Sequence, residues 1–161
     1  MPDFWLDADV FIRSKNEFYG FDIAPAFWDF LDQKAGEGII ASSRLVYDEL
    51  HNETSDELSN WADARKDTLF IEPDAEVQAA CREIADYVKA NYSLPQAAGF
   101  LNGADPWLVA HAKAHGGTIV TFEEPRPNSQ TPKIPDLCAA FNLNPPIKIW
   151  DLLRKLGASF R

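Results

Sequence analysis

Residues 4–12 read Phe-Trp-Leu-Asp-Ala-Asp-Val-Phe-Ile, a short apolar run that stops at two acids. The run over residues 4–6 is typical of a buried strand, and the break at residues 7–9 predicts that this strand ends in a loop. Four further short apolar runs are predicted strands, at residues 39–41, 69–71, 118–121 and 147–149.

Helical patterns separate these runs. The clearest one, over residues 77–88, has an apolar face and a charged face. Asp105 and Pro106 supply a polar cap and a first-turn proline for a helix that runs to residue 114. The other predicted helices cover residues 26–33, 45–50, 55–65, 136–141 and 151–156, and residues 123–135 form an exposed, proline-rich loop. This alternation predicts an α/β fold, with a central, mostly parallel sheet of four to five strands and helices on both faces.

The composition fits one globular domain. The chain has 161 residues, of which 46% are hydrophobic and 25% charged, so we expect a single domain over residues 1–161. No apolar run approaches the roughly 18 residues of a membrane span, and the N-terminus lacks the pattern of a signal peptide. Cys81 and Cys138 are isolated, so they predict buried free thiols. We therefore expect a cytoplasmic protein that does not enter a membrane.

The charge balance is strongly acidic. Asp and Glu total 25 against 15 Lys and Arg, which gives a net charge of −10. Residues 46–86 carry 12 acids and three basic side chains, whereas residues 148–161 carry a net charge of +3. Such a balance is not typical of a nucleic-acid binder, because affinity for phosphate comes largely from Lys and Arg. The acids either serve solubility alone or include a cation site.

Four acids follow the predicted strands. Asp7 ends the first strand, Glu123 follows the fourth, Glu49 lies on the helix after the second, and Asp105 begins a later helix. Ligands bind beyond the carboxyl ends of parallel strands, so these acids could converge at one edge. Each also has a structural explanation, as a turn residue, a helix cap or a solvated side chain. Oxygen ligands without His or Cys suit Mg²⁺ or Mn²⁺, which help to hydrolyse phosphodiesters.

Other candidate motifs are weaker. His111 and His115 are four residues apart on one helix, but without a third ligand they are interpreted as packing or surface residues. The sequence has no phosphate-binding glycine loop and no nucleophile elbow. The five tryptophans are interpreted mainly as packing residues, with base stacking as the minor alternative; they are Trp5, Trp28, Trp61, Trp107 and Trp150.

The order of these motifs resembles a known family. Besides residues 4–12, the relevant stretches are Leu-Val-Tyr-Asp-Glu-Leu at 45–50, Gly-Ala-Asp-Pro-Trp-Leu-Val-Ala-His-Ala at 103–112, and Thr-Ile-Val-Thr-Phe-Glu at 118–123. Together they resemble the four motifs of PIN-domain ribonucleases, including the VapC-like toxins, over residues 4–124. Residues 124–138 most resemble a PIN-like subfamily catalogued as DUF4411. The resemblance implies a PIN-like three-layer sandwich.

The resemblance also implies an activity. It implies a metal-dependent endoribonuclease, often the toxin of a type II toxin–antitoxin pair, with Mg²⁺ or Mn²⁺ held by four acids. The acids that carry over as catalytic and metal-binding residues are Asp7, Glu49, Asp105 and Glu123. The partners implied are an RNA substrate and an antitoxin protein, and a second copy of the chain is a further candidate.

The sequence departs from the family pattern near the fourth acid. The usual Asp is replaced by Glu123, and Glu124 follows it, so either could face the metal. Asp9 and Asp136 are additional candidate ligands, and an acid cluster of this density could hold two metals. Arg126 and Lys133 are the candidate RNA-binding residues on its rim, together with Arg13, Lys15 and Arg44.

Two other hypotheses about the function remain open. Asp7-Ala8-Asp9-Val10 resembles the opening of haloacid-dehalogenase-type phosphatases, with Asp7 as nucleophile and Asp9 as acid or base. The paired acidic motif that such enzymes carry after the Thr is missing here. The non-enzymatic alternative is a catalytically silent PIN-like module whose acids bind a basic partner.

Overall fold

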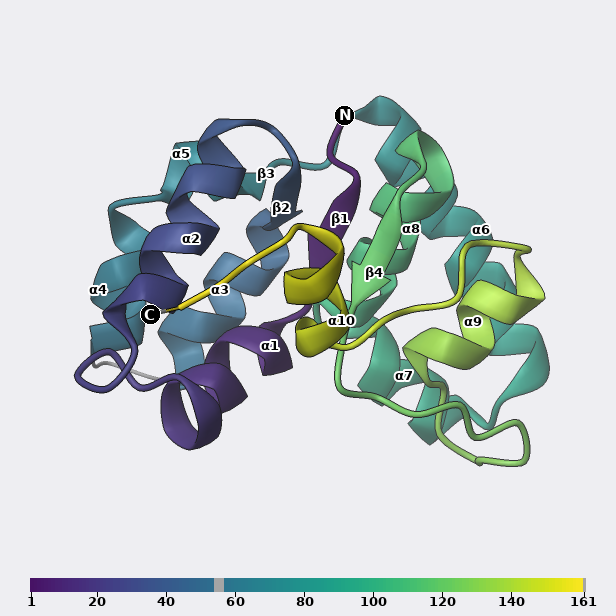
Figure 1. The fold of residues 1–161 in the computed structure, drawn as a ribbon. Helices are drawn as coiled ribbons and strands as arrows, with labels where there is room; N and C mark the ends of the chain where they lie inside the picture. Colours follow the sequence, from purple (N-terminus) through teal and green to yellow (C-terminus); the bar gives the residue numbers. More distant parts are fainter. Residues whose placement is uncertain (54–56, 161) are drawn as a thin grey trace.

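A four-stranded parallel sheet lies at the centre of the computed structural model, which describes residues 1–53 and 57–160 (Figure 1). The strands are β1 (Phe4–Leu6), β2 (Ile40–Ser43), β3 (Phe70–Ile71) and β4 (Thr118–Val120), in the order β3-β2-β1-β4. The helices are α1 (Ala8–Arg13), the π-helical turn η1 (Ser14–Phe18), α2 (Pro25–Gly36), α3 (Arg44–Glu53), α4 (Glu57–Asp63), α5 (Lys66–Leu69), α6 (Ala75–Asn91), α7 (Leu94–Leu101), α8 (Asp105–His115), α9 (Ile134–Ala140) and α10 (Ile149–Lys155). The predicted α/β fold is confirmed.

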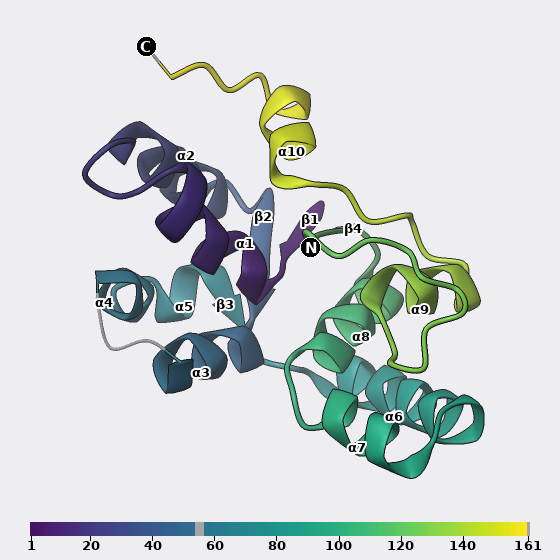
Figure 2. The ribbon, with the colours of Figure 1, turned by 90° about the horizontal axis from the view of Figure 1, so that it is seen from below.

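The sheet is the middle layer of the fold, and its central strand is largely buried. Trp5 and Leu6 of β1 are fully buried, because this central strand has β2 on one side and β4 on the other. Helices α2 and α10 lie on one side of the sheet, and α8, with α6 and α7 outside it, lies on the other (Figure 2). Parallel strands need such crossover helices, and they leave the carboxyl ends of β1, β2 and β4 at one edge.

The chain after β1 differs from the prediction. Asp7 accepts a hydrogen bond from the backbone N–H of Ala8 through Oδ1 at 2.7 Å and caps α1, so the strand passes directly into a helix and not into a loop. Val10 and Phe11 on this helix are fully buried and hold it against the core. Asp9 lies in the first turn of α1.

Two further stretches differ from the expected elements. Of residues 147–149, only Ile147 pairs with the sheet, at a single parallel bridge to Val120. The backbone N–H of Lys148 donates to Asp151 Oδ2 at 3.2 Å, and α10 begins at once. Helix α7 was not expected, because a proline near its start and a glycine inside it obscure the pattern. Residues 55 and 56 of the predicted 55–65 helix lie outside the described residues.

The junction of α8 and β4 is held by tight packing. Trp5 Nε1 donates to the carbonyl of Gly116 at 2.9 Å, and Gly117 has φ +98° with Trp5 Nε1 only 3.0 Å from where a Cβ would stand. His111 stacks on Trp5 with ring centroids 4.6 Å apart, and burial lowers the pKa of His111 to about 4. A neutral, buried ring at this position is a packing residue, and His115 contacts Asp74 instead.

Two other expectations concern the burial of the cysteines and the presence of a membrane-spanning helix. Cys138 is buried and Cys81 is half-buried, and both thiols are free. Among the helices of residues 1–53 and 57–160, none combines the length and the apolar character needed to cross a membrane.

Candidate metal centre

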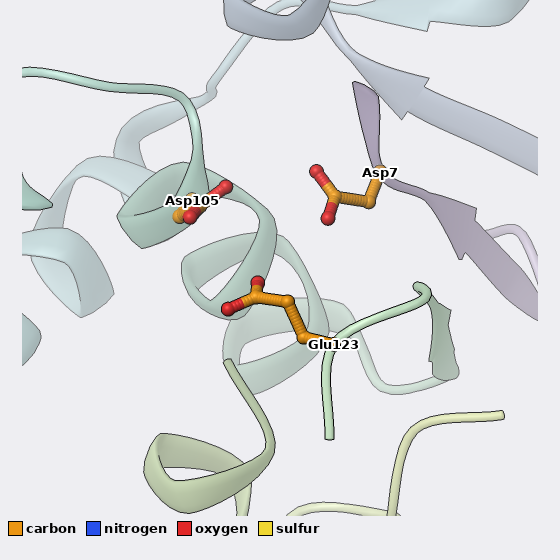
Figure 3. Close-up of side chains that lie close together, drawn as sticks. All are labelled: Asp7, Asp105 and Glu123. Carbon is orange, nitrogen blue, oxygen red and sulfur yellow. The ribbon is translucent and has the colours of Figure 1, made fainter. Parts of the chain in front are cut away.

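Three carboxylates meet at the carboxyl edge of the sheet. Oxygen atoms of Asp7, Asp105 and Glu123 all lie within 4.8 Å of one another. Asp7 comes from the end of β1, Asp105 from the first turn of α8, and Glu123 from the segment after β4 (Figure 3). Segments that are far apart in the sequence therefore bring three negative charges to one point.

Asp7 is the most constrained of the three. Its side chain is only 4% exposed, and Oδ1 is held by the backbone N–H of Ala8. The hydroxyl of Thr121 donates to Asp7 Oδ2 at 2.8 Å, and the backbone N–H of Asp7 donates to Val120 at 3.0 Å. These bonds tie the ends of β1 and β4 together and fix the direction of the carboxylate.

Asp105 and Glu49 are linked through the start of α8. Asp105 is the first residue of α8 and Ala104 is its N-cap residue, so Asp105 is not the predicted cap of this helix. Glu49 Oε1 accepts instead from the backbone N–H of Ala104 at 2.8 Å. A Cβ at Gly103 would stand 3.1 Å from the same oxygen, so the glycine leaves room for Glu49 to reach α8.

All four predicted acids border one cleft of about 340 Å³. It is lined by Asp7, Ala8, Asp9, Ile12, Arg13, Glu49, Asp105 and Glu123. Glu49 borders this cleft but is not part of the three-carboxylate cluster.

The cluster is electrostatically unfavourable by itself. Burial raises the pKa of Asp7 well above its usual range, with further increases from Asp9, Asp105 and Glu123. Burial and the charge of Glu49 raise the pKa of Asp105 to about 6, and burial and Asp105 raise that of Glu123 to about 7. Lys133 acts in the opposite direction on Asp105 and Glu123. Hard oxygen donors with this excess charge fit a divalent cation such as Mg²⁺ or Mn²⁺.

The raised pKa values predict a pH-dependent stability. A carboxyl whose pKa is higher in the folded than in the unfolded chain stabilises the fold at low pH, and this contribution is lost as pH rises through the folded pKa. We expect the free energy of unfolding in EDTA to fall by on the order of 1 kcal/mol between pH 6.5 and 8, the window that includes the pKa of about 7 of Glu123. Mn²⁺ should restore it at pH 8.

Urea unfolding at the two pH values, with EDTA and with Mn²⁺, measures this effect. Glu123→Gln should flatten the pH dependence in EDTA. A stability that stays level or rises over this window in EDTA, or that Mn²⁺ leaves unchanged at pH 8, would contradict the electrostatic picture.

Asp9 adds a fourth carboxylate, half-buried, beside the cluster. Its Oδ2 accepts from the hydroxyl of Thr121 at 3.2 Å and from the backbone N–H of Phe122 at 3.0 Å. Its Oδ1 is buried and has no hydrogen-bond partner within the part of the chain that the structure describes. Asp9 therefore has one oxygen that is available to bind a cation. The hydroxyl of Thr121 positions the carboxylates of Asp7 and Asp9, and we did not single out this residue from the sequence.

Glu124 and Asp136 point elsewhere. Glu124 Oε1 lies 2.6 Å from Lys148 Nζ, in an ion pair on the surface. Asp136 accepts from the backbone N–H of Arg126 at 3.1 and 3.2 Å and fastens the loop after β4 to α9. Of the two adjacent glutamates, Glu123 is therefore the one that faces the cluster.

The predicted basic rim is only partly present. Lys133 and Arg126 line a small hollow of about 230 Å³ that also includes Glu123, and Arg13 lines the acidic cleft. Arg44 does not join them, since it is paired with Asp67 and Glu72 beside β3.

Comparison with known proteins places this chain in a family. Residues 4–160 match the family described as "Domain of unknown function (DUF4411)". The chain belongs to the DUF4411 family. No curated protein matches it. A chain in the crystal structure of VapBC2 from Rickettsia felis bound to a DNA fragment from their promoter is similar, with a TM-score of 0.50 and 19% identity over 74% of this chain and 86% of that chain. The DUF4411 chain therefore has a PIN-like, VapC-like fold, as its motifs predicted.

Proposed function

We propose that this DUF4411 chain is a Mg²⁺- or Mn²⁺-dependent endoribonuclease whose centre is the cluster of Asp7, Asp105 and Glu123. The observation that carries the proposal is the convergence of these three carboxylates within 4.8 Å. Their raised pKa values and the VapC-like fold support it. Asp7 is buried and the other two acids are half-buried, so their charges repel one another and the arrangement is costly unless a cation binds.

Each residue has a defined part in the proposed mechanism. Asp7, Asp105 and Glu123 would hold the cation, and Asp9 and Glu49 border the same cleft. A divalent ion held by these residues would supply a water of lowered pKa and would offset charge on the leaving oxygen. Thr121 fixes the carboxylates of Asp7 and Asp9 through its hydroxyl, and Glu49 holds the start of α8 that carries Asp105.

RNA binding must overcome the net charge of −10. Lys133 borders the same hollow as Glu123, and its positive charge lowers the pKa of Glu123 and Asp105. Arg126 shares this hollow. We propose that both contact phosphates of the bound strand.

Lys133→Ala should weaken RNA binding without weakening Mn²⁺ binding. Loss of one phosphate contact should reduce the slope of log affinity against log salt by about 0.7 for a single strand. Removal of the ammonium also removes its repulsion of a bound cation, so the affinity for the metal should not fall. Anisotropy titrations of a labelled RNA at several salt concentrations measure the slope, and calorimetry measures Mn²⁺ affinity.

Lys89→Ala, which removes an exposed lysine on α6, is the matched control. Arg126→Ala should behave like Lys133→Ala. An unchanged salt slope in both rim variants would exclude this placement of the RNA.

We further propose that the chain is the toxin of a type II toxin–antitoxin pair and acts in the cytoplasm. The similar structure contains VapBC2 with a DNA fragment from their promoter. The acidic cleft supports a partner that inserts a basic side chain, because a guanidinium would form charge-assisted hydrogen bonds with several carboxylates at once. Such a contact would silence the centre in the resting complex.

The proposed activity is tested with a panel of single-stranded and structured RNAs, incubated with the purified chain and Mg²⁺, Mn²⁺ or EDTA. The proposal predicts internal cleavage that needs the metal. Hydrolysis of small phosphate monoesters with a phosphorylated Asp7 would favour the phosphatase reading. No cleavage together with no metal binding would favour the binding module.

A further inference from the structure

Two exposed aromatic side chains touch each other beside the candidate metal centre. Phe18 is 42% exposed and Trp150 is 36% exposed, and their ring centroids are 5.9 Å apart in an edge-to-face arrangement. Both pack on Phe122, at 5.8 Å and 5.4 Å. These three rings, which we call the aromatic patch, come from η1, α10 and the segment after β4.

The aromatic patch adjoins the acidic cleft through two residues. Phe122 directly precedes Glu123, and its backbone N–H donates to Asp9 Oδ2. The guanidinium of Arg13, which lines the cleft, lies 4.2 Å from the ring centroid of Phe122 and 5.6 Å from that of Phe18. Arg13 is held in this position by Glu17, at 3.0 Å. A positive charge therefore lies between the aromatic patch and the proposed metal centre.

The exposure of Phe18 depends on an unusual backbone. The N–H of Tyr19 donates to the carbonyl of Ser14 at 2.6 Å, which closes a π-helical turn. Such turns are rare and often occur at functional sites. The next residue, Tyr19, stacks on the buried Phe27 with ring centroids 4.3 Å apart, so the apolar core lies close to Phe18. The turn nevertheless leaves Phe18 at the surface, on the side of Trp150 and Phe122.

We propose that the aromatic patch is a stacking platform for a nucleobase of single-stranded RNA, next to the phosphate at the metal centre. Stacking on aromatic rings tolerates every base and does not require a positively charged protein. It would therefore add to the affinity from the few phosphate contacts that a chain with a net charge of −10 can make. This inference rests on the proposed ribonuclease function and adds the recognition of its substrate.

The test compares two labelled octaribonucleotides, one with bases and one abasic throughout, in EDTA so that the RNA stays intact. We expect anisotropy to show roughly 5- to 150-fold tighter binding of the base-bearing RNA, the range expected for one stacked base. Trp150→Ala and Phe18→Ala should bring this ratio towards one, whereas Trp150→Phe should keep most of it. Phe160→Ala removes a ring of similar exposure (38%) that packs on Phe30 of α2, and it should leave the ratio unchanged.

Three results would overturn the platform. The first is equal binding of the two RNAs by the natural chain. The second is an equal loss of affinity for both RNAs in Trp150→Ala. The third is a change of oligomeric state in Trp150→Ala with unchanged RNA binding, because the patch would then be an interface between copies of the chain. Metal-dependent cleavage with a binding ratio of one would refute the platform alone. A preserved ratio without any metal-dependent cleavage would refute the nuclease alone.

Discussion

Asp7→Asn is expected to abolish Mn²⁺ binding and RNA cleavage together. Asp7 is the most buried of the three clustered carboxylates, and three nearby acids raise its pKa further. Loss of a group that merely supports a metal ligand costs about 10- to 100-fold in affinity or activity, so loss of a direct ligand should cost more than roughly 100-fold. Calorimetric titration with Mn²⁺ and single-turnover cleavage of RNA measure the two effects.

The fold of this variant should remain intact. An Asn oxygen can still accept from the N–H of Ala8, and the amide can donate to Thr121. With one negative charge fewer in the cluster, the Tm in EDTA at pH 8 should rise. Asp3→Asn, at an exposed position just before β1, is the matched control and should keep full activity. If Asp7→Asn cleaved RNA as fast as the natural chain, the proposed centre would be wrong.

The two adjacent glutamates should respond very differently to the same substitution. Glu123→Gln removes a proposed metal ligand and should slow Mn²⁺-dependent cleavage by more than roughly 100-fold, as for Asp7→Asn. Glu124→Gln removes only a surface ion pair with Lys148, a contact worth about 0–1 kcal/mol. Its cleavage rate should stay within about 2-fold of the natural rate. Cleavage rates of both variants under saturating Mn²⁺ provide the comparison, and Glu124→Gln is an internal control for Glu123→Gln.

The opposite order of effects would reassign the fourth acid. If Glu124→Gln were inactive and Glu123→Gln active, the loop after β4 would have to rearrange when the metal binds. Equal and small losses in both variants would remove this loop from the proposed centre.

The arrangement of the acids could be foreseen because it depends on general features of parallel sheets. Asp7 directly follows an apolar strand, and Asp105 precedes a proline that begins a helix. Carboxyl ends of parallel strands share one edge, so their order along the chain was enough to group them. The family resemblance of the same motifs then supplied the expected chemistry, and the match of residues 4–160 confirms that family.

The sequence could not predict which of two neighbouring acids faces the cluster. Glu123 and Glu124 are identical in chemistry, and Lys148, which lies 24 residues after Glu124, binds the one that does not face the cluster. Similarly, Asp136 is held by a backbone N–H of the loop before it. These contacts depend on tertiary packing, which has no local pattern.

The aromatic patch shows the same limitation. Phe18, Phe122 and Trp150 are separated by more than a hundred residues at the extremes, and each reads as a packing residue in its own segment. Only their meeting beside Arg13 joins them in one patch.

Helix α1, in contrast, has a local signal in the sequence. Asp7 is a residue type that often caps a helix, but the stretch of Asp7 and Asp9 predicted a loop.

The most direct test of the metal centre is anomalous scattering from a crystal soaked in Mn²⁺, with data collected on both sides of the manganese absorption edge. The proposal predicts an anomalous peak bounded by the carboxylates of Asp7, Asp105 and Glu123, and its loss in crystals of Asp7→Asn. A cleft that is open to solvent in the crystal and shows no peak at millimolar Mn²⁺, or a peak bound only by other residues, would contradict it.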